Sequence, residues 1–387
     1  MSDSPLHGLR VLELARVLAG PWAGQLLADL GADVIKVEAP GGDQTRQWGP
    51  PFVESPSGAR DAAYFHAANR GKRSVVIDFS TPAGQAEVRR LAAEADVLIE
   101  NFKVGSLKKY RLDYESLSKE NPGLVYCSIT GFGQDGPYAS RPGYDFVIQG
   151  MSGIMDLTGE PDGPPQKMGV AFGDIFAGLY AVIGIQAALE HRGRSGRGQH
   201  VDISLLDAMV GVLANQGMNY LVSGVSPERL GNRHPNIAPY EALPTLDGWF
   251  VLAVGSDAQF RRFCAVVELQ ALADDPRYAT NQDRVRNRDA LSASIAATTK
   301  RRTSADLLDA LERHNVPAGP INTVEQALTD SQIAARGLLL SLTRAADGAE
   351  IPGIRTPIRF SDAKLKAEQP SPLLDENNEA NWRQEPD

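Results

Sequence analysis

The amino-acid sequence predicts an α/β protein whose larger domain has a Rossmann-like fold. Residues 9–14, 20–30 and 33–38 have the apolar patterns of a strand, a helix and a second strand, which together form a βαβ unit. The chain of 387 residues exceeds the size of a comfortable single core, so we expect two domains. After about residue 222 the composition of the sequence changes, and the predicted helices become polar. This change predicts a second, smaller α/β domain.

The other elements of the larger domain follow in order. The turn at 15–21 lacks the three spaced glycines that let a backbone approach a pyrophosphate, so the βαβ unit is not predicted to bind NAD. Residues 131–136 match G-x-G-x-x-G, but Pro137 and Pro142 oppose the helix that a dinucleotide site requires. We interpret this run as a glycine-rich active-site or structural loop. Strands are predicted at 73–79, 96–100, 124–130 and 199–205, and helices at 81–95, 143–146 and 206–221.

The stretch 169–189 starts with small residues, contains Asp174 and continues as an almost wholly apolar helix. A helix that is apolar on nearly every face is normally buried, so we expect its start to lie deep in the molecule. Asp174 stands where an N-cap residue stands. From this stretch alone two interpretations are open: a cap that accepts free backbone N–H groups, or a nucleophilic carboxylate that the helix N-terminus keeps ionised.

The second part of the chain is predicted to form a small domain and then a tail. Residues 223–239 are loop-like, a strand hairpin is expected around 249–254, and Ser304 is expected to cap a helix. The polar tail at 375–387 is expected to be loose or wrapped on a partner. Helices are predicted at 257–267, 287–300 and 304–314, and short strands at 338–343 and 355–360.

Composition argues against several classes of function. The net charge of −9 opposes nucleic acid as the main partner, because nucleic acid requires a basic face. We expect no signal peptide and no membrane span, since no apolar run reaches about 18 residues. The two cysteines, Cys127 and Cys264, indicate a reduced, cytoplasmic setting. The six histidines show no metal-ligand spacing, so no metal is expected.

Two segments have the composition of anion-binding sites. Residues 69–73 carry three cations, which form either a solvated turn or a phosphate clamp. Residues 101–110 place an aromatic beside basic and amide groups directly after a strand, where open α/β sheets usually bind ligands.

Several stretches, taken in order, resemble one known family. No single motif is specific, but their order and spacing match the class III CoA-transferases, the family of formyl-CoA transferase, carnitine CoA-transferase and 2-methylacyl-CoA racemase. The resemblance covers essentially the whole chain, as far as Pro372-Leu-Leu374. The matching stretches are Val11-Leu-Glu-Leu14, Ala19-Gly-Pro21, the runs 30–38, 69–74 and 128–133, Glu100-Asn-Phe102, Gly143-Tyr-Asp145 and Gly173-Asp174.

The resemblance implies a large Rossmann-like domain built from both chain ends, with a smaller α/β domain inserted and two subunits interlocked as a homodimer. The expected boundaries are 1–222 and 331–387 for the large domain and 223–330 for the small one. The resemblance also implies that Asp174 is the catalytic nucleophile, which makes capping a secondary role. A carboxylate with a pKa of about 4 is already ionised at neutral pH and needs no neighbouring base.

A CoA thioester is then a substrate, and no permanently bound cofactor is expected. The resemblance places six residues in the CoA site: Val17, Lys72, Asn101, Phe102, Lys109 and Tyr110. Ala39 replaces an arginine that contacts CoA in formyl-CoA transferase, so Arg46 or Arg73 is expected to supply part of the anion clamp. Arg16 and Leu18 stand where that enzyme has His and Gln, which argues against oxalate as the acceptor acid.

Three activities remain open: CoA transfer, racemisation of a 2-methylacyl-CoA through proton transfer by Asp174, and acyl-CoA binding without turnover. The family's racemases use a histidine in the segment that matches Gly143-Tyr-Asp145. Tyr144 here is a poor proton acceptor with a pKa of about 10, which favours transfer. The amino-acid sequence as a whole most resembles those of transferases that use succinyl-CoA and short dicarboxylic acids such as glutarate. The expected substrate site comprises Arg16, Leu18, Arg46, Tyr144, Asp145 and His234, with Arg233 as a further cation for a distal carboxylate.

Overall fold

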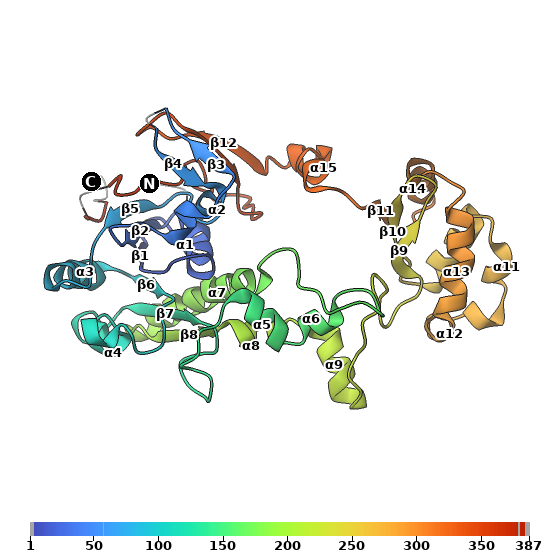
Figure 1. The fold of residues 1–387 in the computed structure, drawn as a ribbon, viewed down its shortest axis with the longest axis horizontal. Helices are drawn as coiled ribbons and strands as arrows, with labels where there is room; N and C mark the ends of the chain where they lie inside the picture. Colours follow the sequence, from blue (N-terminus) through green and yellow to red (C-terminus); the bar gives the residue numbers. More distant parts are fainter. Residues whose placement is uncertain (1–3, 57, 378–379, 384–387) are drawn as a thin grey trace. The chain divides into compact units, whose positions relative to one another are not determined.

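The computed structural model describes residues 4–56, 58–377 and 380–383, and the chain divides into two compact units (Figure 1). The first unit contains Met1–Gly153, Met168–Leu213 and Ser331–Asp387, and the second contains Ile154–Lys167 and Ala214–Asp330. The chain therefore leaves and re-enters the first unit twice. Both ends of the chain belong to that unit.

The first unit is built on a parallel sheet of six strands, which confirms the α/β fold class. The strand order is β5-β2-β1-β6-β7-β8, and every neighbouring pair is parallel. The direction in which strands are added reverses between β1 and β6, so the loops that follow these two strands diverge and leave a crevice between them. The strands are β1 (Arg10–Glu13), β2 (Asp33–Glu38), β5 (Arg73–Val76), β6 (Val97–Glu100), β7 (Val125–Thr130) and β8 (His200–Ser204).

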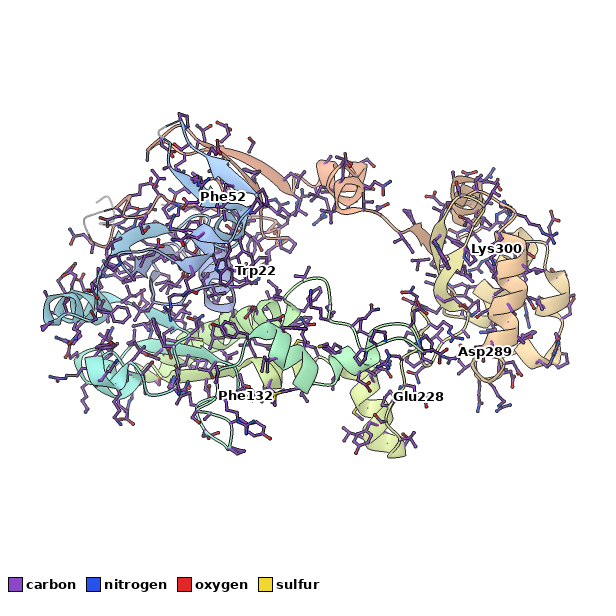
Figure 2. The ribbon with its side chains drawn as sticks, in the orientation of Figure 1. Trp22, Phe52, Phe132, Glu228, Asp289 and Lys300 are labelled. Atoms are coloured by element: carbon purple, nitrogen blue, oxygen red, sulfur yellow. The ribbon has the colours of Figure 1, made fainter. Side chains whose placement is uncertain are left out.

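Helices cover this sheet, and α1 (Ala19–Asp29) packs extensively against α7 (Phe172–Ser195). A side-chain Cβ at Gly178 of α7 would lie 2.8 Å from the carbonyl oxygen of Ala19 and 3.1 Å from the ring of Trp22. Only glycine permits this approach. Figure 2 labels Trp22 on α1. The other helices of this unit are α2 (Ala63–His66), α3 (Pro82–Glu94), α4 (Tyr114–Glu120), α5 (Asp145–Met151), α8 (Leu205–Gly211) and α16 (Ser331–Ala335), with 3-10 turns η1 (Gln44–Gln47) and η2 (Lys108–Tyr110).

Helix α7 is half-buried, which corrects the expectation that its apolar sequence would be buried on nearly every face. One side packs against α1, β7 and β8, whereas Leu179, Tyr180 and Ile183 on the other side are exposed. The expectation of no membrane span is also too strong as stated. By length and composition alone α7 could cross a membrane, with a mean hydropathy of 1.6, although the core helix of a soluble protein meets the same criterion.

The last part of the chain packs onto the first part. The indole N–H of buried Trp382 donates to the carbonyl oxygen of Leu91 on α3 (3.3 Å), and Asp375 accepts from the backbone N–H of Val76 (2.8 Å). Within the expected tail 375–387, residues 378–379 and 384–387 lie outside the described residues.

The strand predicted at 355–360 is wrong: β13 (Glu350–Ile354) ends before it and pairs with β12 (Leu339–Thr343). A second small hairpin joins β3 (Phe52–Glu54) to β4 (Arg60–Ala62).

The second unit has a three-stranded antiparallel sheet in the order β11-β10-β9. The predicted helix at 206–221 is in fact two helices, α8 and α9, and Ala214 at the break has a positive φ of 46°. Thr303 rather than Ser304 caps α14, because its side chain accepts from the N–H of Asp306. The elements are α6 (Ile154–Leu157), α9 (Ala214–Ser223), β9 (Tyr240–Pro244), β10 (Trp249–Ala253), α10 (Asp257–Val266), α11 (Gln270–Ala273), η3 (Pro276–Tyr278), α12 (Asn281–Arg286), α13 (Arg288–Thr299), α14 (Ser304–Arg313), β11 (Ala318–Pro320) and α15 (Val324–Leu328).

Arg284 is the fully buried cation around which part of the second unit is arranged. Its guanidinium donates to the carbonyl oxygens of Ala238 (2.7 Å) and Tyr278 (3.1 Å) and to the carboxylate of Asp257 (2.8 Å). These bonds connect three segments that are distant in sequence. A buried polar network of this kind stabilises only when every member has its partner.

We expect Arg284→Ala to lower the free energy of unfolding of the second unit by about 3 kcal/mol, because it leaves buried carbonyl groups and a carboxylate without their donor. Thermal and urea unfolding monitored by circular dichroism measure this change. The matched control is Arg277→Ala. Arg277 is itself exposed and makes a solvent-screened pair with Asp275, so its cost is expected to stay below about 1 kcal/mol. Equal effects of the two substitutions would contradict the role assigned to Arg284.

Candidate active site

A cavity of about 270 Å³ lies where the sheet reverses direction, at the carboxyl ends of β1, β6 and β7. This edge of an open α/β sheet is the usual place for a ligand. Asp174, in the first turn of α7, is among the residues that line the cavity. The residues that line it include Arg16, Val17, Leu18, Asn101, Phe102, Lys103, Thr130, Gly131, Arg141, Tyr144 and Asp174.

The turn after β1 is fixed by side chains from other segments. The Asn101 side chain accepts from the N–H of Arg16 (2.9 Å) and donates to its carbonyl oxygen (2.6 Å). Val17 has a φ of 70°, a left-handed conformation that a β-branched residue rarely adopts. Helix α1 begins directly after this turn without a side-chain cap and without an acidic residue in its first turn. Its first N–H groups therefore provide a positive end at the wall of the cavity.

Asp174 is the third residue of α7 and does not cap it, which corrects the expected N-cap position. Asp145, the first residue of α5, performs that role, because its carboxylate accepts from the N–H of Gly173 (2.7 Å). The Gln149 side chain donates to the other oxygen of Asp145 (2.7 Å). Asp145 therefore supports the first turn of α7, and the carboxylate of Asp174 remains available to a ligand in the cavity.

The carboxylate of Asp174 is harder to ionise than an ordinary aspartate. Burial and the nearby negative charge of Asp145 raise its pKa to about 7. The expectation of a pKa of about 4 is therefore wrong, and the carboxyl titrates near neutral pH. A carboxylate that is poorly solvated is a stronger nucleophile once it is ionised, since less hydration must be removed before it attacks.

Tyr64 lies near the site, although it is not among the residues that line the cavity. Burial raises the pKa of Tyr64 to about 12, and the negative charges of Asp174, Asp145 and Asp43 add to this effect. Its ring makes an edge contact with Trp48, with ring centroids 5.3 Å apart. No motif singled out Tyr64, because the short helix α2 brings it to the site only through tertiary packing.

Three cations line the cavity and form no ion pair with any residue that the structure describes: Arg16, Lys103 and Arg141. Arg16 lies 4.6 Å above the ring of Phe102, and Arg141 lies 3.9 Å above the ring of Tyr138. Tyr138 in turn contacts Phe132, which Figure 2 labels in the segment after β7. The sequence reasoning missed Lys103 and Arg141 as site residues. A signal for Arg141 existed, since the two prolines around it predict a fixed loop next to the glycine-rich strand end.

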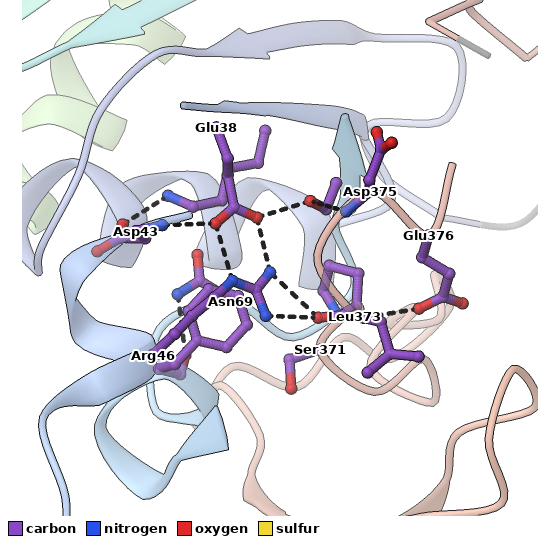
Figure 3. A network of polar contacts seen from close by, with 12 residues as sticks. Glu38, Asp43, Arg46, Asn69, Ser371, Leu373, Asp375 and Glu376 are labelled. Carbon is purple, nitrogen blue, oxygen red and sulfur yellow. Dashed lines mark hydrogen bonds and ion pairs between the residues drawn. The ribbon is translucent and has the colours of Figure 1, made fainter. Parts of the chain in front are cut away.

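Three of the cations that were predicted to bind substrate are paired with carboxylates and do not line the cavity. Lys72 is buried and bonds to Glu13, Arg46 forms buried ion pairs with Glu38 and Asp61, and Arg73 forms a bidentate pair with Asp33. Figure 3 shows the guanidinium of Arg46 between Glu38 and the carbonyl group that precedes Leu373. The structure does not bring these cations to the cavity. His234 lies in the second unit, as does Arg233, which is paired with Asp289.

Lys109 and Tyr110 lie in the segment after β6. They belong to a cluster of aromatic rings, with one cation, beside the cavity wall. The rings of Phe102 and Tyr110 both contact Phe79, with centroid distances of 5.7 and 5.6 Å, and the ammonium of Lys109 lies 4.5 Å from the Tyr110 ring. The predicted CoA-site residues Phe102, Lys109 and Tyr110 are therefore brought together. An aromatic surface next to a cation suits a heterocycle that carries phosphate groups.

Comparisons with known proteins agree with this geometry. The model of CoA-transferase family III matches residues 6–378. A succinate–glutarate CoA-transferase of Agrobacterium fabrum is 61% identical over 375 residues, which cover 96% of this chain and 94% of that protein. An acetyl-CoA:oxalate CoA-transferase of Acetobacter aceti is 40% identical over 379 residues, which cover 97% of this chain and 94% of that protein.

The fold has a close counterpart among solved structures. The crystal structure of a CAIB/BAIF family protein from Brucella suis matches with a TM-score of 0.88 and 60% identity, over 97% of both chains. Since the family model and these relatives extend over nearly the entire sequence, the chain belongs to CoA-transferase family III and is a CoA-transferase.

Proposed function

We propose that this CoA-transferase moves CoA from succinyl-CoA to a short dicarboxylic acid such as glutarate. The observation that carries the proposal is Asp174, a poorly solvated carboxylate. Its cavity also holds the uncapped start of α1 and three cations that have no ion pair within the described part of the chain. The name of the 61%-identical relative supports the choice of succinate and glutarate. The 40%-identical relative, named for oxalate, shows that the acceptor differs within this range of identity.

The proposed chemistry proceeds through four exchanges at Asp174. Its carboxylate attacks the thioester carbonyl of succinyl-CoA, the C–S bond breaks, and a mixed anhydride and CoA thiolate form. The thiolate attacks the Asp174 carbonyl and releases succinate, which leaves an aspartyl-CoA thioester. The acceptor carboxylate then attacks this thioester to form a second anhydride and thiolate, and the thiolate attacks the acceptor carbonyl and regenerates the Asp174 carboxylate. No net proton is consumed.

The walls of the cavity suit the negative charges that these four exchanges create. Each exchange passes through a tetrahedral intermediate with a negative oxygen, and unpaired backbone N–H groups stabilise such an oxygen when they point at it. The first turn of α1 offers N–H groups of this kind, and Arg16 lies next to them. CoA phosphates and the distal carboxylate of a dicarboxylic acid supply further negative charge for Lys103 and Arg141 to bind.

A homodimer is part of the proposal. The side of α5 and α7 that faces away from the sheet is apolar and exposed, and an exposed apolar surface of this kind is typical of a protein interface. A second copy of the chain that covers this surface would also shield the Asp174 site, which the first turn of α7 carries. The exposed apolar residues on these elements are Phe146, Val147, Met151, Leu179, Tyr180 and Ile183.

The proposal includes a cytoplasmic location and no resident cofactor. Succinyl-CoA brings the activated acyl group with it, and the exchange at Asp174 involves no oxidation or reduction. Cys127 and Cys264 are both free and buried, as suits a reducing compartment.

Incubation of the enzyme with succinyl-CoA and then hydroxylamine is expected to leave a hydroxamate on the peptide that carries Asp174, detected by mass spectrometry. Asp174→Asn is expected to abolish both the adduct and the appearance of glutaryl-CoA, since an amide cannot form the anhydride. A racemase or a non-catalytic binder would leave the wild-type peptide unmodified. That result, together with proton exchange at the α-carbon of a 2-methylacyl-CoA, would overturn the proposal in favour of racemisation.

The rate of transfer is expected to rise with pH around the raised pKa of Asp174. Below about pH 7 the carboxyl is protonated and cannot attack, so kcat/KM increases through pH 7 and then levels off. Asp145→Asn retains an acceptor for the N–H of Gly173 but removes the neighbouring charge, so the acidic limb of its profile is expected to move to lower pH. A wild-type limb near pH 4 would contradict the electrostatic assignment.

The same pKa predicts how stability changes with pH. The folded-state pKa of Asp174 lies above its value of 3.8 in the unfolded chain, so ionisation disfavours the folded state as pH rises from about 4 to 7. Asp174→Asn removes this cost and no cap. We therefore expect it to be more stable than the wild type at pH 8, with a difference that disappears near pH 4, as measured by thermal unfolding at each pH.

Arg141 is expected to determine the preference for a dicarboxylic acceptor. Arg141→Met is expected to raise KM for glutarate about 10- to 100-fold, the loss of one charge-assisted contact, and to leave KM for butyrate unchanged. Arg141→Lys keeps the charge and is expected to lose less. Lys119→Met on the exposed face of α4 is the control. An equal loss with acetyl-CoA as donor and butyrate as acceptor would assign Arg141 to the CoA phosphates instead.

A further inference from the structure

The backbone of the turn at residues 15–17 is held by side chains rather than by its own hydrogen bonds. Lys36 of β2 donates to the carbonyl oxygen of Ala15 (3.0 Å), and Asn101 binds both backbone groups of Arg16. Asp43 accepts from the N–H of Val17, at 3.2 and 3.4 Å from its two oxygens. Two segments that are distant in sequence, residues 36–43 and the start of the loop after β6, therefore determine the course of this turn.

Behind the turn lies a buried ion cluster formed by Glu13, Lys36, Asp43 and Lys72. Lys36 lies between the carboxylates of Glu13 (3.1 Å) and Asp43 (3.0 Å), and Lys72 is paired with Glu13 (2.7 Å). All four side chains are almost completely buried. Gly24 makes space for the carboxylate of Glu13, because a Cβ at this position would lie 1.8 Å from one of its oxygens.

Burial of four charged groups does not by itself explain the cluster. The desolvation of buried ion pairs commonly offsets their attraction, so apolar side chains of similar size would stabilise a sheet at least as well. Burial alone would raise the pKa of Asp43, but Lys36 and the N–H of Thr45 outweigh burial and hold that pKa below its ordinary value. Asp43 is thus a fixed negative charge, and its oxygens are directed at Lys36, Thr45 and Val17.

Val17 shows what this arrangement maintains. A β-branched residue in the left-handed region is strained and persists only where the surroundings enforce it. Val17, the neighbouring Arg16 and the start of α1 all line the cavity that holds Asp174. The enforced conformation therefore lies at the reaction site and not on the remote side of the sheet.

We propose that Asp43, supported by Lys36 of the buried ion cluster, is a positioning residue that holds the strained Arg16–Val17 turn and so aims the uncapped N–H groups of α1 into the Asp174 cavity. The inference rests on the proposed function, because the groups it positions are the ones that stabilise charge during CoA transfer. Asp43 itself touches no reacting atom. Its backbone N–H donates to Glu38 (2.8 Å), which fixes the other end of the segment (Figure 3).

The test compares Asp43→Ala with a matched variant of a second buried carboxylate. Asp29 is also almost fully buried, pairs with Arg70 and accepts from the backbone N–H of Thr356 (3.0 Å), but it has no contact with the turn. Both substitutions are expected to lower the melting temperature. Only Asp43→Ala is expected to reduce kcat/KM, by about 100-fold and mainly through kcat, as a displaced site does. Asp43→Asn keeps an acceptor for Val17 and is expected to recover part of the loss.

Two further measurements separate positioning from a structural role. Hydrogen exchange of the peptide that contains Val17 and Leu18 is expected to become faster in Asp43→Ala and to stay unchanged in Asp29→Ala. Because glycine adopts a φ of 70° without strain, adding Val17→Gly to Asp43→Ala is expected to recover part of the lost kcat and melting temperature.

The outcomes are distinguishable from a failure of the proposed function. If wild-type enzyme transfers no CoA between any donor and acceptor, the proposed function is wrong, and the exchange measurement still reports whether Asp43 holds the turn. If the wild type is active and Asp43→Ala, corrected for the folded fraction, has the same kcat and KM as Asp29→Ala, the positioning role is overturned.

Discussion

The reversal of strand order between β1 and β6 is the constraint on which the rest of the site depends. In a parallel sheet every strand ends at the same edge, and only at the reversal do the following loops turn away from each other. The turn after β1 and the loop after β6 thus become opposite walls of one cavity, and Asn101 joins them through the backbone of Arg16. The start of α7 brings the carboxylate of Asp174 into this cavity.

Asp145 and Asp174 divide two roles between them, the capping of α7 and nucleophilic attack. A single aspartate at the start of the helix would have to combine both. Asp145 is satisfied by the N–H of Gly173 and by Gln149, and so it supports the helix. Asp174 is left half-buried, and its neighbour makes its ionisation harder. A carboxylate that is difficult to ionise is unfavourable for folding and useful for attack on a thioester, a compromise typical of functional sites.

The sequence predicted local features well and tertiary contacts poorly. The first βαβ unit agrees with the structure to about one residue at each end, because period and turn residues are local signals. The break between α8 and α9 at Ala214 had no such signal. Asp174, Asn101 and Phe102 were singled out from the residues themselves and given roles by the resemblance to a family, whereas Arg16 came from the resemblance alone. All four line the cavity. The ion pair of Arg73 with Asp33 joins residues 40 positions apart, and no reading of periodicity could reveal that this cation is already neutralised.

The return of the chain end to the first unit has a consequence for biosynthesis. Arg46 donates to the carbonyl oxygen of Pro372, Val76 donates to Asp375, and Trp382 fills a place beside α3. A nascent chain on the ribosome therefore exposes part of the β5 and α3 surface until residues 372–382 have been translated. The second unit, whose sequence is complete earlier, can fold while the first still waits for its final segment.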